Sequence, residues 1–110
     1  MALFIGTDGA FNSTTGSVAD DTFIGGANGA INEFMGESGN FDPFGNDTFT
    51  GGANSTNTFY GDQQVINGAG GDDILTGGAN STNTLYGDAF IMVGGTGGTL
   101  TGGVNGTNYL

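Results

Sequence analysis

The stretch Asp47–Asp62, DTFTGGANSTNTFYGD, returns almost unchanged as DILTGGANSTNTLYGD at Asp73–Asp88. Two related segments flank this pair, DTFIGGANGAINEFMGE from Asp21 and TLTGGVNGTNYL from Thr99. Each segment carries a pair of glycines, and the pairs begin at Gly25, Gly51, Gly77 and Gly102. The successive differences are 26, 26 and 25 residues. A fixed period of this length indicates a repeat architecture, because a single unit is too small to bury its own apolar face and must stack on its neighbours.

Apolar residues recur within each period in short runs of alternating polarity, bounded by Gly, Asn or Asp. This pattern predicts very short strands separated by tight turns. We therefore expect an all-β fold, a parallel β-solenoid of about four to five coils of about 26 residues, stacked at roughly 4.8 Å. Residues 1–110 form one domain in this interpretation, with 1–16 as a degenerate opening coil and 17–110 as the repeats. We expect Phe23, Phe34, Phe49 and Phe59 to stack in the core. The recurring apolar residues are Phe23, Phe34 and Phe41 or Phe44 in the first period, Phe49, Phe59 and Ile66 in the second, Leu75, Leu85 and Ile91 in the third, and Leu100 with Tyr109 or Leu110 in the last.

The chain has an unusual charge balance. Its 110 residues include 11 acidic side chains and no lysine, arginine or histidine, which gives a formal net charge of −11. No carboxylate can find a cationic side chain, so neutralisation has to come from outside the chain. Nucleic acid is excluded as an expected partner, and no apolar run is long enough for membrane insertion. Because histidine, cysteine and lysine are absent and the carboxylates repeat, we do not expect an enzyme.

Two columns of carboxylates follow from the repeat. The first column has an aspartate at each interval of 26 residues, and two of these aspartates are preceded by another. In the second column, each acidic residue comes directly after a glycine. Stacked coils would hold like charges about 5 Å apart, where they repel by on the order of 3 kcal/mol at an effective dielectric of about 20. Either the pKa values rise or a cation lies between them, and oxygen-rich turns suit calcium. The candidate ligands are Asp20, Asp21, Asp47, Asp72 and Asp73 in the first column and Glu37, Asp62 and Asp88 in the second.

The stretch GAGGDDILTGG at Gly68–Gly78 resembles the RTX, or haemolysin-type calcium-binding, nonapeptide G-G-x-G-x-D-x-U-x. FGNDTFTGG and ADDTFIGG, which contain Asp47 and Asp21, are similar to it. The resemblance implies a β-roll that binds Ca²⁺ in its turns through carboxylates and backbone carbonyls. It also implies an extracellular or cell-surface bacterial protein exported by type 1 secretion. Every second unit departs from the family pattern by carrying Asn where the family has Asp, at Asn32, Asn57, Asn83 and Asn108.

One asparagine and one threonine recur in the glycine-rich part of each copy. We expect the asparagines to form a ladder in which each amide bonds the next coil. The threonines suit strands, and a regular threonine array would also suit an ice-binding face. The expected ladder residues are Asn28, Asn54, Asn80 and Asn105, and the threonines are Thr50, Thr76 and Thr101.

The last copy stops on an apolar strand, and the start of the chain offers another. An uncapped solenoid end exposes unpaired backbone groups, which favours strand addition. We therefore predict a structural subunit that stacks head to tail into an extracellular, calcium-dependent filament, with itself and calcium ions as partners. The alternative is a monomeric RTX-like calcium-binding module of a secreted or adhesive protein, and ice binding is a third possibility. The expected assembly residues are Leu3, Phe4, Ile5, Tyr109 and Leu110.

Overall fold

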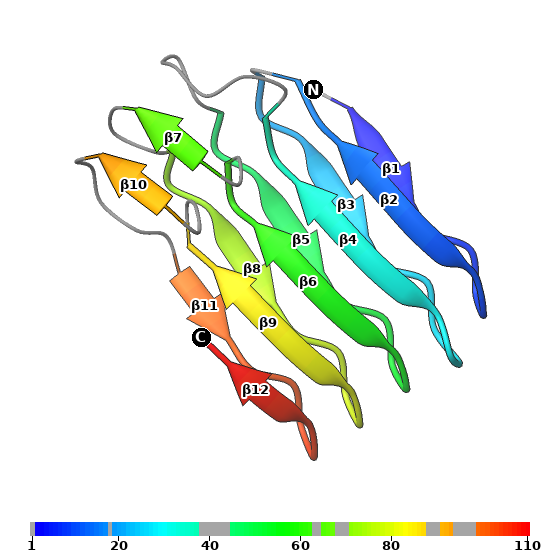
Figure 1. Ribbon diagram of the computed structural model, residues 1–110. Coiled ribbons are helices and arrows are strands. Elements are labelled where there is room, and N and C mark those ends of the chain that lie inside the picture. The colour runs from blue at the N-terminus through cyan, green and yellow to red at the C-terminus, as the bar shows by residue number, and fades with distance from the viewer. Residues whose placement is uncertain are drawn as a thin grey trace.

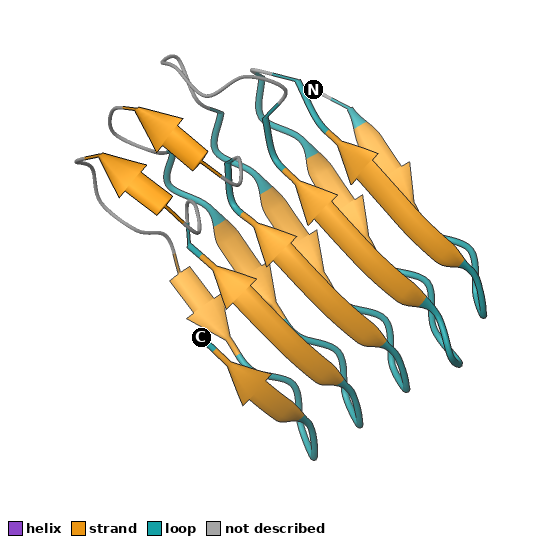
Figure 2. Cartoon of the chain, in the orientation of Figure 1, coloured by secondary structure: helices purple, strands orange, loops and turns teal. Residues whose placement is uncertain are grey.

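The molecule consists of two five-stranded parallel sheets that face each other. A computed structural model describes residues 2–17, 19–37, 45–62, 65–67, 71–87, 91–93 and 99–110. Segments 65–67 and 91–93 are described by their backbone alone. No helix occurs within these ranges (Figures 1 and 2). It follows that none of them supplies a helix long and apolar enough to cross a membrane. The all-β arrangement is consistent with the predicted solenoid.

The chain passes back and forth between the two sheets. The first sheet has the order β1 (Leu3–Ile5), β3 (Thr22–Ile24), β5 (Thr48–Thr50), β8 (Ile74–Thr76) and β11 (Thr99–Thr101). The second has the order β12 (Thr107–Tyr109), β9 (Thr82–Tyr86), β6 (Thr56–Tyr60), β4 (Ile31–Met35) and β2 (Phe11–Thr15). A further parallel pair is formed by β7 (Val65–Asn67) and β10 (Ile91–Val93). We use the word rung for one strand of each large sheet and the turn that joins them, such as β5 and β6 (Figure 1).

The strand register reproduces the sequence repeat. Phe23 pairs with Phe49, and Phe49 pairs with Leu75, so equivalent residues of successive repeats lie side by side. On the second sheet Phe34 pairs with Phe59 in the same way. Side chains alternate between the two faces of a strand, so one apolar residue per strand points into the space between the sheets.

Those inward residues form the core. The stacked core predicted for Phe23, Phe34, Phe49 and Phe59 is confirmed: these side chains and those of Leu75 and Leu85 are at most 1% exposed, and Phe4 and Leu100 pack against them while partly buried. The recurring apolar residues Tyr109 and Leu110 are exposed instead. Phe41 and Phe44 lie outside the described residues. The rings stack in columns, with centroids 4.5 Å apart for Phe23 and Phe49 and 5.4 Å apart for Phe34 and Phe59. Ile66 and Ile91 lie on β7 and β10, whose side chains are outside the described part of the structure.

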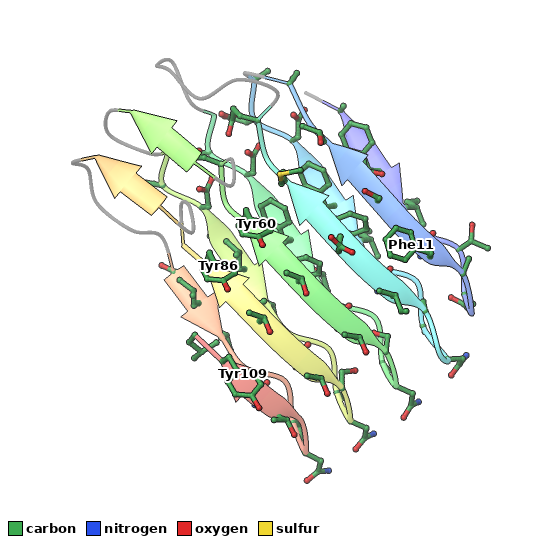
Figure 3. All side chains as sticks on the ribbon, in the orientation of Figure 1. Phe11, Tyr60, Tyr86 and Tyr109 are labelled. Carbon is green, nitrogen blue, oxygen red and sulfur yellow. The ribbon has the colours of Figure 1, made fainter. Side chains whose placement is uncertain are left out.

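The outer face of the second sheet carries polar and aromatic side chains. Figure 3 shows Tyr60 and Tyr86 next to each other on neighbouring strands, and their ring centroids lie 4.8 Å apart with nearly parallel planes. Tyr109 lies on the neighbouring strand β12, where it pairs with Thr84, two positions before Tyr86, and Phe11 lies at the other end of the sheet on β2 (Figure 3). On the outer face of the first sheet, Thr50, Thr76 and Thr101 pair in register as the repeat predicts.

The asparagine ladder is present, but the prediction assigned it to the wrong residues. The predicted residues Asn28, Asn54, Asn80 and Asn105 are exposed, and their φ angles of 54°, 53°, 51° and 54° lie in the left-handed region. Asparagine tolerates this conformation better than other residues with a Cβ, because its short polar side chain can bond locally. These four residues therefore form the tight turns between the sheets.

The ladder runs instead through the asparagines that point inward from the second sheet. The Nδ2 amide of each one donates to Oδ1 of the next, at 2.8 Å from Asn12 to Asn32, 2.7 Å from Asn32 to Asn57, and 2.8 Å from Asn57 to Asn83. A fourth bond of 2.8 Å joins Asn83 to Asn108. Asn32, Asn57 and Asn83 are completely buried, and each also bonds the backbone of its own turn.

Candidate metal centre

Three buried carboxylates converge at the end of the sheets opposite the asparagine turns. Glu37 follows the last residue of β4 by two positions, Asp47 precedes β5, and Asp62 follows β6. One carboxylate oxygen from each lies within 4.8 Å of the others, and each residue is at most 1% exposed. We call these three residues the carboxylate cluster. The chain offers no cationic side chain that could neutralise it.

Asp47 reaches the cluster from a column of aspartates that supports the first sheet. Its Oδ1 accepts the Asp21 N–H at 2.6 Å, and the Asp47 N–H in turn donates to Oδ1 of Asp73 at 2.7 Å. Each aspartate thus bonds the backbone of the preceding rung. The other oxygen, Oδ2 of Asp47, is buried and has no hydrogen-bond partner in the part of the chain that the structure describes.

Glu37 and Asp62 reach the cluster from the second column, and each accepts a backbone N–H from the residues that lead into the next strand of the first sheet. Oε1 of Glu37 accepts the Gly45 N–H at 2.5 Å, and the Asp62 carboxylate accepts the Gly71 N–H at 3.0 and 3.2 Å. The backbones of the two acids are also joined, because the Glu37 N–H donates to the Asp62 carbonyl at 2.7 Å. The two acids therefore occupy equivalent positions on neighbouring rungs.

Glycines make room for these carboxylates. A Cβ on Gly36 would overlap both Oδ2 of Asp47 and the carbonyl of Gly61. A Cβ on Gly61 would overlap Asp73 Oδ2 in the same way. The glycine that precedes each acid of the second column is therefore required by close packing against the first column.

The environment raises the pKa values of two of the acids. Burial raises the pKa of Glu37 to about 10, and the hydrogen bond with Asp62 adds to the rise. Burial also raises the pKa of Asp47 to about 7, although the hydrogen bond from the Asp21 backbone opposes the rise. Glu37 is thus protonated at neutral pH unless a cation replaces its proton.

The predicted ligands divide into several groups. Glu37, Asp47 and Asp62 come together in the cluster. Asp21 and Asp73 are buried neighbours of Asp47 in the first column. Asp20 and Asp72 are exposed and belong to an outer ladder, in which Asp20 Oδ1 accepts the Asn46 N–H and Asn46 Oδ1 accepts the Asp72 N–H, both at 2.8 Å. Asp88 lies outside the described residues.

Ser17 occupies the position of Glu37 on the first rung, and sequence reasoning missed it. Both its N–H and its Oγ donate to Oδ2 of Asp21, at 2.7 and 3.1 Å. Asp21 therefore has hydrogen-bond donors at both oxygens, because the Ala2 N–H donates to Oδ1 at 2.8 Å. The pairing of β2 with β4 would have shown that Ser17 aligns with Glu37, since Thr15 pairs with Met35.

Comparisons of the chain with protein-family models, with curated proteins and with solved structures found no match. The site is therefore described by its own chemistry: a buried all-oxygen cluster that could hold a metal ion.

Proposed function

We propose that this protein is a structural subunit of an extracellular filament, and that a calcium ion bound by Glu37, Asp47 and Asp62 stabilises its fold. The observation that carries the proposal is the carboxylate cluster itself, because three buried acids occur in a chain without a single basic residue. A buried charge without a partner is costly, so the cluster must be neutralised by protons or by a cation.

The residues of the cluster suit a hard cation. All of the ligand atoms are carboxylate oxygens, and Oδ2 of Asp47 is a buried acceptor that no backbone N–H, side-chain amide or hydroxyl of the described residues reaches. Ca²⁺ takes oxygen ligands from carboxylates and backbone carbonyls in flexible arrangements, whereas Mg²⁺ usually retains several waters. The resemblance of Gly68–Gly78 to RTX repeats supports calcium, and it supports an extracellular location reached by type 1 secretion.

The filament is suggested by the two open edges of the sheets. β1 and β2 form one edge, and β11 and β12 form the other (Figure 1). Edge strands present unpaired N–H and C=O groups and pair readily with another chain unless charges, prolines or bulges prevent it. When one copy adds its β1–β2 edge to the β11–β12 edge of another copy, its own β11–β12 edge stays free to add a third copy, so the assembly propagates.

A monomeric calcium-binding module is the second candidate. All three acids of the cluster come from one chain, so the ion could bind without any partner. The two candidates differ in the outcome of adding calcium: the filament subunit forms long assemblies, whereas the monomeric module forms single folded particles.

Negative-stain electron microscopy of the purified chain tests the proposal, with samples in millimolar calcium and in chelator. The control is the double variant Glu37→Gln, Asp47→Asn, which keeps the size of both side chains and removes two ligand charges. We expect the intact chain to form filaments in calcium and not in chelator. We expect the variant to show no response to calcium. Discrete particles in calcium would favour the monomeric module, and filaments that ignore both calcium and the substitutions would contradict the role of the cluster.

A further inference from the structure

The asparagine ladder has a direction, which makes its two ends chemically different. In every bond the Nδ2 amide of one asparagine donates to Oδ1 of the asparagine on the next rung along the chain. Asn12 therefore presents an acceptor at the β2 edge, and Asn108 presents a donor at the β12 edge. A donor at one end and an acceptor at the other fit each other only when copies of the chain follow one another in the same direction.

The terminal asparagines have weaker or fewer bonds than those inside the ladder. Oδ1 of Asn32 accepts both the Gly26 N–H at 3.0 Å and the Asn12 amide at 2.8 Å. Oδ1 of Asn12 accepts the Thr7 N–H at 2.9 Å and no other group in the described part of the chain. At the opposite end, Nδ2 of Asn108 donates to the carbonyls of Gly103 and Gly106 at 3.2 and 3.3 Å. Each end thus has capacity for the bond that continues the ladder.

Charge is nearly excluded from both edges, although the chain carries a net charge of −11. Residues 99–110 contain no charged side chain, and residues 2–17 contain only Asp8, which lies in the exposed turn between β1 and β2. The acids are concentrated on the rungs between these two. Two copies can therefore join edge to edge without bringing carboxylates into contact, whereas other faces would meet strong repulsion.

The β1–β2 edge is also hollowed. A hollow of about 420 Å³ is lined by residues of both strands, including Phe4 and Thr14, and by Phe34 of β4. It arises where β2 carries Thr14 at the position that Phe34 holds on the next rung. Leu110 follows Leu85 by 25 residues and is 67% exposed at the other edge, so it is an apolar side chain available for this space.

We infer that a second copy of this chain places its β1–β2 edge on the β11–β12 edge of the first, and that the Asn108 amide of the first copy donates to Oδ1 of Asn12 of the second. This inference rests on the proposed filament and specifies its joint. The strands continue in parallel and in register, because the ladder bond forms at one relative position only. The backbone follows the pattern of the interior, in which the Gly6 N–H donates to the Ile24 carbonyl and the Gly77 N–H to the Thr101 carbonyl. By that pattern the Gly102 N–H donates to the Ile5 carbonyl of the second copy.

The substitution Asn108→Asp tests the joint without disturbing the chain's own ladder. The Asn108 side chain accepts the Asn83 amide at 2.8 Å and the Gly103 N–H at 2.9 Å through Oδ1, and a carboxylate can accept both. A carboxylate cannot donate, so the variant loses the bond to Asn12 of another copy together with the two long bonds from Nδ2 to the carbonyls of Gly103 and Gly106. The matched control is Asn80→Asp, which makes the same exchange at an exposed turn outside the ladder.

Assembly is followed at pH 7 in calcium by sedimentation and by electron microscopy, with circular dichroism as the check on folding. We expect Asn108→Asp to raise the critical concentration for assembly by at least about tenfold, because a carboxylate facing the Asn12 oxygen is repelled. Asn80→Asp should assemble like the intact chain. If the intact chain does not form filaments, the proposed function fails; if it does and Asn108→Asp assembles equally well, the ladder joint fails while the filament stands.

A mixing experiment separates a blocked joint from a damaged chain. The Asn108→Asp variant keeps an intact β1–β2 edge, so it should add to the β11–β12 edge of a growing filament and stop further addition there. We therefore expect it to shorten filaments of the intact chain when present at a small fraction of the total. A variant that merely fails to fold would leave filament length unchanged, and that result would overturn the inference.

Discussion

The substitution Asn57→Ala removes the middle of the ladder. The Asn57 side chain is completely buried and takes part in four hydrogen bonds. Its amide donates to Asn83 Oδ1 at 2.8 Å and to the Gly52 carbonyl at 3.3 Å, while its Oδ1 accepts from Asn32 at 2.7 Å and from the Ser55 hydroxyl at 3.1 Å. Alanine interrupts the ladder and leaves one N–H of Asn32 buried without its acceptor.

The expected loss of stability follows from these contacts. The Gly52–Asn57 bond is long, and the Ser55 hydroxyl keeps its bond to the Gly52 carbonyl, so the two ladder bonds dominate. Each contributes about 0.5–1.5 kcal/mol, and a buried donor left without a partner costs about 1–3 kcal/mol. We therefore expect the free energy of unfolding to fall by about 2–6 kcal/mol.

Urea unfolding followed by circular dichroism measures this loss, with Asn54→Gly as the matched control. Asn54 is exposed at a φ of 53°, a conformation that glycine adopts without strain, so its replacement should change stability by less than about 1 kcal/mol. A loss below about 1 kcal/mol for Asn57→Ala, or an equal loss for both variants, would show that the inward asparagines do not support the fold.

Two further substitutions address the carboxylate cluster. Glu37→Gln should stabilise the chain in chelator at pH 8. Burial raises the pKa of Glu37 from its ordinary value of 4.5 to about 10 in the folded state, so folding binds a proton and stability falls as pH rises between these values. The variant should lose this pH dependence in unfolding midpoints measured from pH 5 to pH 9, and an unchanged slope would contradict the assignment. Gly36→Ala should destabilise the chain by about 1–3 kcal/mol in a thermal or urea melt, because its Cβ would overlap Asp47 and the Gly61 backbone, and a neutral effect would show that the packing there can relax.

Local patterns in the sequence were sufficient to predict the core. Phe23, Phe49 and Leu75 recur at intervals of 26, and the alternation around them fixes which face of each strand is buried. The same two-residue rule places Asn57 on the inner face with Phe59, two positions later. That signal for the ladder was present in the sequence, but the resemblance to calcium-binding repeats marks Asn57 only as a position where the family has Asp.

The grouping of the acids could be predicted only in part. Regular spacing placed Asp47 in one column and Glu37 and Asp62 in another, but spacing along a column does not reveal the distance between columns. Glu37 meets Asp47 because β4 and β5 end and begin at the same end of the sheets and because Gly36 allows close approach. Such contacts depend on packing across the end of the sheets, which a single sequence does not specify. Asp20 and Asp72 differ from their buried neighbours only by strand alternation, which places them on the exposed side.

The most direct test of the proposed calcium site is isothermal titration calorimetry of the intact chain with calcium at pH 7, repeated in buffers of different ionisation enthalpy. Because Glu37 holds a proton at this pH, the account predicts that each ion bound at the cluster releases roughly one proton or more, so the measured heat should vary with the buffer. Asp47→Asn should lose this binding event. Absence of binding to the intact chain, or the same affinity and proton release in Asp47→Asn, would contradict the central claim that the buried carboxylates hold the ion.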